Sequence, residues 1–274
     1  MKKKSKLELW IAFFAIALIY VAVAILEQTV DSNHIIFTVL KKGAIYSLVA
    51  VSMNLLNGFT GLFSLGQAGF MLIGAYTYAI FTMPVEVKMT EQVYKYYASA
   101  IHFDTGIFVG LICAGLAAAL FAALIGLPVL RLKSDYLAIA TIGFAEIIRA
   151  IFQWDVLGPV TNGANVMREY LDLTDVKIPF TDIPFPPTLY VFLAAGVCIA
   201  LIVLLINSSY GRAFKAIRDD EVAAEAMGIN LFKHKEMSFV ISSFFAGVSG
   251  ALLAMYQYTV QAAQFKSAMT YEIL

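Results

Sequence analysis

The stretch GLFSLGQAGF, residues 61–70, lies between two long apolar runs and contains three glycines, a serine, a glutamine and no charged residue. Glycine permits turns, unwinding and close contact between helices. In lipid, irregular backbone is tolerated only where protein or a water-filled cavity covers it. The stretch therefore predicts a broken or re-entrant segment inside a bundle of membrane-spanning helices.

The composition of the whole chain agrees with a membrane protein. Of its 274 residues, 61% are hydrophobic and 14% are charged, against roughly 45–50% and about 25% in soluble domains. Backbone groups in lipid must be hydrogen-bonded within their own segment, so the fold class is an all-α polytopic transmembrane bundle, predicted as a single domain over 1–274. The apolar runs predict seven spans, at 9–26, 38–57, 69–83, 106–130, 135–155, 187–206 and 237–258.

Charge and motif content exclude several function classes. The formal net charge is zero, which gives no electrostatic support to nucleic-acid binding. Cys113 and Cys198 lie inside apolar runs and the three histidines are scattered, so no disulfide framework or metal site is predicted. The sequence contains no HExxH, GxSxG or GxxxxGK[ST] motif, and we predict no catalytic residue, no ATP-binding loop and no cofactor.

The first run, 9–26, follows the basic segment MKKKSK and has two interpretations. The small residues at 22–24 fit a signal-peptide cleavage site, whereas the length of the run and the spans that follow favour an uncleaved first span. The distribution of Lys and Arg favours an N-terminus in the cytoplasm. In that orientation the hydrophilic segments 84–105 and 156–186 are external, and the charged segment 207–236 is internal.

The internal segment predicts two short helices. In the first, Arg212, Lys215 and Arg218 recur every three residues and form a basic stripe that can lie at anionic lipid head groups. The acidic cluster at 219–221 favours the start of the second helix, because carboxylates cap free N–H groups and match the helix dipole. Gly228 is placed to end this helix. It either packs on its own protein or docks a cytoplasmic subunit.

The segment RAFKAIRDDEVAAEAMGINLFKHK resembles the cytoplasmic coupling motif, Glu-Ala-Ala followed by Gly, of bacterial ABC importer permeases. GFTGLFSLGQAGFMLIGAYTYA and SDYLAIATIGFAEIIRAIFQ resemble the LivM-like subunits of the branched-chain amino acid family. The resemblance covers about residues 35–274. Family members continue with a glycine-rich segment and further spans, so the chain is expected to be a truncated product or one piece of a split subunit.

The resemblance implies a permease subunit of an ATP-driven importer that moves leucine, isoleucine or valine across the bacterial plasma membrane. It implies a second homologous permease subunit, two cytoplasmic ATPase subunits and an extracytoplasmic substrate-binding protein as partners, besides membrane lipids. In the family, the loop helix inserts into a cleft of the ATPase. The ATPase-coupling residues implied here are Arg218, Asp219, Asp220, Glu221, Ala224, Glu225 and Gly228.

The glycine-rich break supplies the candidate translocation path. A half-helix N-terminus there could meet a carboxylate with its free N–H groups, as broken transporter helices do. The alternative is plain packing of helices through small residues. The candidate residues are Asn57, Gly61, Ser64, Gly66, Gln67 and Gly69.

Glu146 and Arg149 lie within the fifth predicted span. Their i, i+3 spacing places them on one helix face, within pairing reach. Either they line the translocation cavity or they form an internal ion pair that orients helices. An ion-coupled secondary transporter that uses Glu146 as its coupling carboxylate is the alternative function.

The segment VTNGANV contains Thr161, Asn162 and Gly163, and the Asn-Gly pair favours a turn. One interpretation is an ordinary external turn. The family carries a Thr-Asn-Gly-like segment where the substrate-binding protein docks, and the resemblance implies that role here. The chain departs from the family pattern after Gly163.

Overall fold

The computed structural model describes residues 6–29, 34–89, 94, 99–132, 134–177 and 184–274, and within them no β-strand forms. The long helices are α1 (Lys6–Thr29), α2 (Ile35–Asn54), α3 (Gln67–Thr82), α5 (Ile107–Val129), α6 (Ser134–Phe152), α8 (Pro187–Asn207) and α11 (Leu231–Gln257). The shorter elements are the π-helix η1 (Leu55–Thr60), α4 (Val85–Lys88), the 3₁₀ turn η2 (Asp155–Leu157), α7 (Gly158–Thr161), α9 (Ser209–Asp219), α10 (Glu221–Ala226), the 3₁₀ turn η3 (Ala262–Gln264) and α12 (Ser267–Ile273).

Each predicted span corresponds to one long helix, and the predicted all-α class is confirmed. Within the described residues, four helices are long and apolar enough to cross a membrane alone: α2 extended by η1, α5, α8 and α11. A fifth crossing results if α6 and the η2–α7 segment, bent by 60°, count as one span. α3 has 16 residues, about 24 Å in length, which is shorter than the roughly 30 Å hydrocarbon core.

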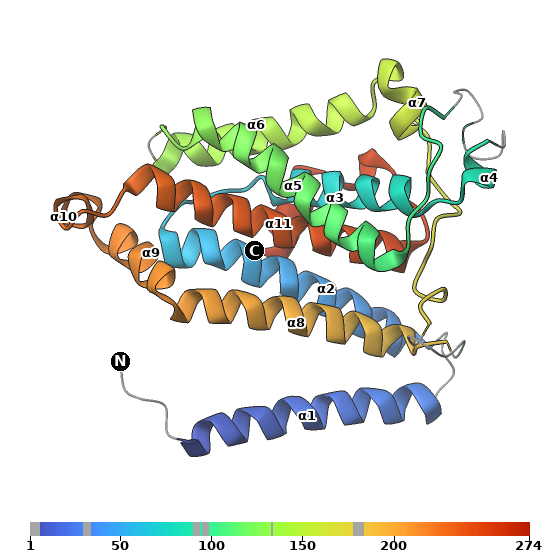
Figure 1. The fold of residues 1–274 in the computed structure, drawn as a ribbon, viewed down its shortest axis with the longest axis horizontal. Coiled ribbons are helices and arrows are strands. Elements are labelled where there is room, and N and C mark those ends of the chain that lie inside the picture. The colour runs from blue at the N-terminus through green and yellow to red at the C-terminus, as the bar shows by residue number, and fades with distance from the viewer. Residues whose placement is uncertain (1–5, 30–33, 90–93, 95–98, 133, 178–183) are drawn as a thin grey trace.

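α11 is the central helix of the bundle and packs against α2, α3 and α5 (Figure 1). Its apolar window is 78% buried, compared with 22–33% for the other three spans. Glycines allow this approach: a Cβ at Gly74 or Gly250 would lie 2.0 Å from the backbone oxygen of Gly247 or Met71, respectively. These contacts are the close helix packing that small residues permit.

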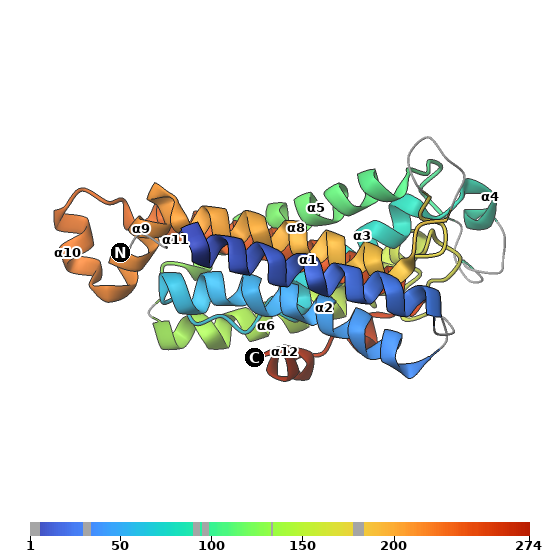
Figure 2. The same cartoon turned by 90° about the horizontal axis from the view of Figure 1, so that it is seen from below.

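The hydrophilic segments divide between the two ends of the bundle (Figures 1 and 2). α9 and α10 lie at one end, here called the α10 end, and α4 and α7 lie at the opposite α7 end. The segments predicted as external therefore share one end, opposite the segment predicted as internal. The first turn of α1 lies toward the α10 end. The basic residues at 2–4 lie outside the described residues.

The two hydrophilic segments at the α7 end are bonded to each other. The Tyr94 hydroxyl donates to the carbonyl of Val160 at 3.0 Å, and the N–H of Ala100 donates to the carbonyl of Pro159 at 3.0 Å. Burial raises the pKa of Tyr94 to about 12, so its hydroxyl remains a donor at neutral pH. Hydrogen bonds thus join the two hydrophilic segments into one structure at this end of the bundle.

α1 lies at the edge of the bundle and contacts α8 (Figure 1). The Tyr20 hydroxyl donates to the carbonyl of Phe192 at 2.8 Å. The Glu27 carboxylate accepts from the N–H groups of Thr188 and Leu189, at 2.8 and 3.2 Å. Glu27 thereby caps the start of α8, whose first N–H groups have no partner within their own helix.

Candidate functional site

The glycine-rich break joins a turn at the α10 end to a helix that starts inside the bundle. η1 ends at Gly61, which has φ 76°, and the N–H of Leu62 donates to the carbonyl of Leu56 at 3.1 Å. Residues 61–66 then run irregularly back into the bundle, and α3 continues to the α7 end (Figure 1). The six irregular residues reach up to about 20 Å and so extend the short α3 to a full crossing. The prediction of a broken or re-entrant segment is confirmed, and the segment takes the form of a broken span.

Side chains satisfy the irregular backbone of this break. The N–H of Ser64 donates to Asn57 Oδ1 at 3.0 Å, and the N–H of Leu65 donates to Thr141 Oγ1 of α6 at 3.1 Å. Ser64 and Leu65 are buried. A buried N–H without an acceptor costs about 1–3 kcal/mol, so Asn57 and Thr141 stabilise this conformation. Protein covers the broken backbone at Ser64 and Leu65, as the membrane setting requires.

The start of α3 is also closed by neighbouring helices. The N–H of Ala68 donates to Thr270 Oγ1 of α12 at 3.2 Å. The Gln67 side chain is fully buried and donates to Ser242 Oγ of α11 at 3.0 Å, while its Oε1 has no partner among the described residues. In this conformation an N–H group at the N-terminus of α3 therefore bonds to the Thr270 hydroxyl. A role for Gln67 in translocation stays a prediction and requires a conformation in which α12 moves.

Gly66 and Gly69 lie directly against α6. A Cβ at Gly66 would be 2.8 Å from the carbonyl oxygen of Thr141, and one at Gly69 would be 2.9 Å from the Cα of Ala145. Because backbone atoms fill both spaces, a larger residue would separate α3 from α6. The packing interpretation of these two glycines thus has direct support. Their role in a translocation path stays a prediction.

The basic stripe of α9 contacts the turn that begins the break. Arg218 Nη1 donates to the carbonyl of Gly58 at 3.0 Å, and its side chain also pairs with Asp219 at 2.8 Å. Lys215 Nζ lies 5.3 Å from the centre of the Phe59 ring. Two sites predicted separately, the coupling segment and the break, are therefore joined by direct contacts.

α10 is a helix whose own residues cap both ends. Asp220 Oδ1 accepts from the N–H groups of Val222 and Ala223, at 2.9 and 3.1 Å. Gly228 has φ 85°, and the N–H of Ile229 returns to the carbonyl of Ala224 at 3.1 Å. The predicted acidic start and glycine end are confirmed. These caps account for a stable helix of only six residues at this position.

The surface of α10 is largely free. Its Val222 side chain and the following Met227 are 78% and 83% exposed, whereas Ala224 is buried. Glu221 pairs with Lys235 of α11 at 2.7 Å, which ties the helix to the bundle. Glu225 is exposed. α10 projects beyond the end of the bundle (Figure 2), so an exposed apolar face remains for a docking partner.

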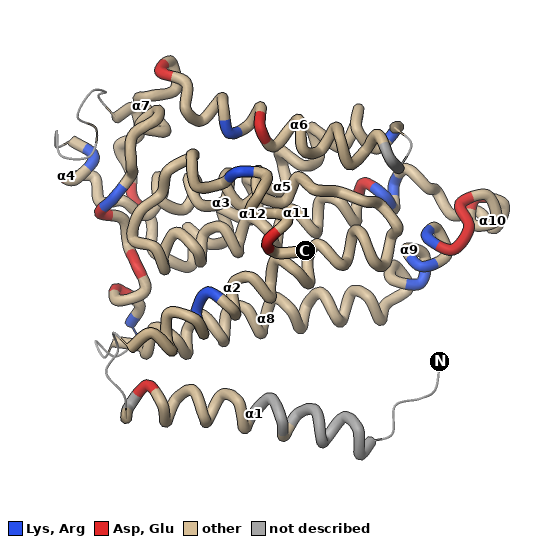
Figure 3. Tube along the Cα trace, turned by 180° about the vertical axis from the view of Figure 1, so that it is seen from behind, with Lys and Arg blue, Asp and Glu red and all other residues tan. Residues whose placement is uncertain are grey.

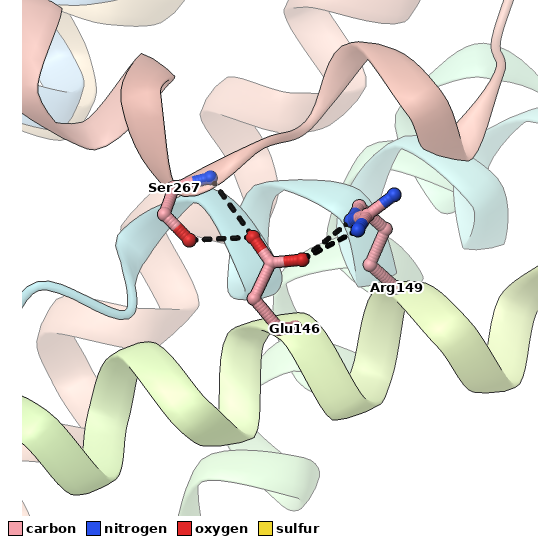
Figure 4. A network of polar contacts seen from close by, with 3 residues as sticks. All are labelled: Glu146, Arg149 and Ser267. Carbon is pink, nitrogen blue, oxygen red and sulfur yellow. Dashed lines mark hydrogen bonds and ion pairs between the residues drawn. The ribbon is translucent and has the colours of Figure 1, made fainter.

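Glu146 and Arg149 form the predicted ion pair (Figure 4). Arg149 Nη2 lies 2.6 Å from Glu146 Oε2, and the Ser267 hydroxyl donates to Glu146 Oε1 at 2.6 Å. The side chains of Arg149 and Glu146 are 27% and 38% exposed. The pair connects α6 to the first residue of α12, as the ion-pair interpretation expects. Its partial exposure leaves the lining interpretation open.

The Thr161–Gly163 turn is internally bonded. Thr161 and Asn162 are buried, and Asn162 and Gly163 both have φ 59°. Asn162 Nδ2 donates to the carbonyl of Val166 at 3.3 Å. These features fit the ordinary-turn interpretation. Docking of a binding protein stays a prediction, and its direct contacts would fall on exposed neighbours such as Arg168.

Charged residues occupy one side of the bundle at the level of the spans. Figure 3 shows them on α6, at α12 and on α2 on the side turned to the viewer. Lys42, Lys266 and Glu272 are exposed. Charge facing lipid is costly, so this side is suited to a partner or a water-filled cavity. Many large apolar side chains of α1, α5 and α8 are instead exposed, as a lipid-facing surface requires.

Comparison with known proteins identifies the family. A profile described as "Branched-chain amino acid transport system / permease component" matches residues 35–274. The chain belongs to this family. Its sequence is of LivM type, and its long apolar helices are those of a multi-pass membrane protein.

Relatives within this permease family are longer than the chain. The chain is 31% identical over 281 positions to "High-affinity branched-chain amino acid transport system permease protein LivM" of Escherichia coli (strain K12), which covers 93% of the chain and 60% of that relative. It is 30% identical to the LivM protein of Salmonella typhimurium, covering 82% of the chain and 53% of the relative. The chain thus spans less than two thirds of the length of these relatives. No solved structure matches it.

Sequence reasoning missed the hydroxyl groups that hold the break. Thr141, Ser242 and Thr270 each bond to a residue of the segment 61–70 or the first turn of α3. Their only signal in the sequence is a polar side chain inside an apolar or terminal helix. The charged side chains of Lys266 and Glu272 were likewise not predicted to belong to a site.

Proposed function

We propose that this permease subunit belongs to an ATP-driven ABC importer and forms part of the path for leucine, isoleucine or valine. The observation that carries the proposal is α10, a self-capped helix that projects from the bundle with Val222 and Met227 exposed. Large apolar side chains in such a position favour contact with another protein. The chain has no phosphate-binding loop, so ATP hydrolysis is assigned to separate subunits.

The contacts of α9 give the proposal a mechanical route. Motion of α10 would be passed to α9, and from Arg218 and Lys215 to η1 at Gly58 and Phe59. η1 leads directly into residues 61–66, so rotation of this turn pulls on the start of α3. Alternating access requires one element to move against the rest of the bundle. The break together with the first turn of α3, whose hydrogen bonds come from η1, α6, α11 and α12, is that element in this proposal.

The surfaces of the molecule accommodate the proposed partners. Two ATPase subunits would bind at the α10 end of the two permeases, which places this end and the N-terminus in the cytoplasm of a bacterial cell. An extracytoplasmic substrate-binding protein would dock at the α7 end. A second homologous permease would cover the charged side formed by α2, α6 and α12, because charged groups there cannot face lipid at low cost.

The docking surface is tested by Val222→Asp and Met227→Asp, made together in the chain co-expressed with the genes next to it. Both residues are exposed, so folding is expected to be unchanged, whereas co-purification of the ATPase and leucine uptake into proteoliposomes should fall at least about tenfold. Val222→Ile and Met227→Leu, made together, keep both exposed side chains apolar and are the matched control. Unchanged uptake in the double variant would contradict the docking role of α10.

The same assay separates ATP-driven from ion-coupled transport. Leucine uptake by proteoliposomes that hold the permease and no ATPase, and its loss in Glu146→Gln, would replace the proposal with a secondary transporter. The ATP-driven mechanism predicts no uptake without the ATPase.

A further inference from the structure

A cavity of about 200 Å³ opens on the charged side of the bundle, between α2, the end of α11 and α12. Its polar lining consists of Tyr46, Gln257, Gln264, Lys266 and Glu272. Within the described residues, the side chains of Gln257, Gln264, Lys266 and Glu272 form no hydrogen bond or ion pair. A cationic group, an anionic group and two amides therefore meet at a cavity without protein partners.

Hydrogen bonds to neighbouring helices hold α12, which forms one wall of this cavity. Ser267, the residue after Lys266, bonds to Glu146 of α6, and Thr270 bonds to the N–H of Ala68 in α3. These bonds fix α12 against two spans, so the backbone that carries Lys266 and Glu272 is positioned before any ligand binds. Sites whose supporting bonds are already formed bind at lower entropic cost.

We infer that this cavity is a binding subsite for the zwitterion of an α-amino acid with an aliphatic side chain. The inference deepens the proposed function and rests on it. The Lys266 ammonium group and the amide N–H groups of Gln257 and Gln264 supply donors for the α-carboxylate. The Glu272 carboxylate accepts from the α-ammonium group. Leu253, Phe265 and Met269, all buried, supply an apolar surface for the side chain.

The size of the cavity agrees with this ligand. Pockets for drug-sized molecules measure about 300–1,000 Å³, so a cavity of about 200 Å³ suits a smaller molecule such as one amino acid. The opposite charges distinguish the subsite from one for a simple anion or cation, because either ion alone would leave Glu272 or Lys266 in the cavity without a charged partner.

The first experiment measures protection of a cysteine in the cavity. Ala268→Cys, at an exposed residue of α12 that lines the cavity, is made after Cys113→Ala and Cys198→Ala, and the full chain in phosphatidylglycerol nanodiscs is labelled with a water-soluble maleimide. This lipid carries no ammonium group and cannot imitate the zwitterion. Leucine at twice its dissociation constant should slow labelling about threefold. Tyr271→Cys, 55% exposed on the same helix outside the cavity, is the control and should label at an unchanged rate.

The second experiment assigns the two charges, using protection of Ala268→Cys as the readout. Lys266→Met should weaken protection by leucine about tenfold, the loss of one charged hydrogen bond, and leave protection by isopentylamine unchanged. Glu272→Gln should weaken protection by leucine similarly and leave protection by 4-methylpentanoate unchanged. Equal slowing at positions 268 and 271, no slowing by leucine, or leucine protection that both charge variants retain in full would each overturn the subsite.

These outcomes are separate from a failure of the proposed function. Leucine uptake by the complete transporter without protection at position 268 would retain the importer and remove the subsite. Protection without ATP-driven uptake would retain the subsite and remove the importer.

Discussion

The break at residues 61–66 and the helix α10 are both short, irregular or marginal pieces of backbone, yet they are stabilised in opposite ways. Most of the break is buried; the N–H of Leu65 in it bonds to Thr141, and the N–H of Ala68 in the first turn of α3 bonds to Thr270, from 76 and 202 residues away in the chain. α10 is exposed, and Asp220 and Gly228 close it within its own segment.

The contrast follows from the surroundings of each segment. Water satisfies any backbone group that α10 leaves open, so local caps are sufficient for a helix at the surface. Lipid and packed apolar side chains cannot form hydrogen bonds with the backbone of the break. Its hydrogen-bond partners must therefore come from neighbouring protein segments. The conformation of the break and of the first turn of α3 therefore depends on how the helices pack, whereas the caps of α10 lie within its own segment.

The largest effect is expected for Gly66→Val. Its Cβ would meet the carbonyl oxygen of Thr141 at 2.8 Å, and neither backbone can shift without breaking the Leu65–Thr141 bond. We expect a loss of stability of about 3 kcal/mol, or failure to fold, from overpacking together with an unsatisfied N–H. Thermal unfolding in detergent measures it, with Gly66→Ala as a milder variant. Gly143→Val, at a glycine of α6 that faces open space, should unfold like the parent.

Removal of the hydroxyls should have the next largest effect. Thr141→Val and Thr270→Val each leave one buried N–H without an acceptor, which costs about 1–3 kcal/mol. Thr141→Ser and Thr270→Ser keep the acceptor and should recover most of that loss. If the valine and serine variants unfold at the same temperature, the hydroxyl bonds do not stabilise the break.

Asp220→Ala should cost about 1 kcal/mol, and only locally, because it removes an N-cap from α10. Faster amide hydrogen exchange over 221–227 with an unchanged unfolding temperature of the bundle is the expected result. Asp219→Ala is the matched control, since Asp219 caps no described N–H group and pairs with Arg218. A drop in global stability for Asp220→Ala would show that α10 is part of the core after all.

Gly228→Ala should have a similar, slightly smaller local effect. No atom lies within 4 Å of the added Cβ, so the cost is the left-handed backbone conformation alone, about 1 kcal/mol. Hydrogen exchange of the N–H of Ile229 reports the loss of the C-terminal turn. An exchange rate equal to that of the parent would contradict the role of Gly228 as the helix end.

The smallest effect is expected for Lys235→Met. It removes the ion pair with Glu221, which is half exposed, so the cost should be about 0.2–1 kcal/mol and should decrease in high salt. Thermal unfolding at low and high ionic strength measures it. A salt-independent loss would mean that the methylene chain of Lys235, rather than its charge, supports α10.

Several features could be predicted because they depend on neighbouring residues or on transfer from water to lipid. The helical spans follow from runs of about 20 apolar residues. The caps of α10 follow from Asp220 and Gly228, and the ion pair follows from the i, i+3 spacing of Glu146 and Arg149. Each of these signals is contained in a few adjacent positions.

The sequence by itself therefore determined the membrane-spanning helical class, the position of the break and the two ends of α10. The tertiary structure alone decided that α12 closes the start of α3, that Arg218 contacts Gly58 from 160 residues away, and that Lys266 and Glu272 meet at one cavity. The physical reason is that buried polar groups accept any partner of suitable geometry, and which partner arrives depends on how the helices pack.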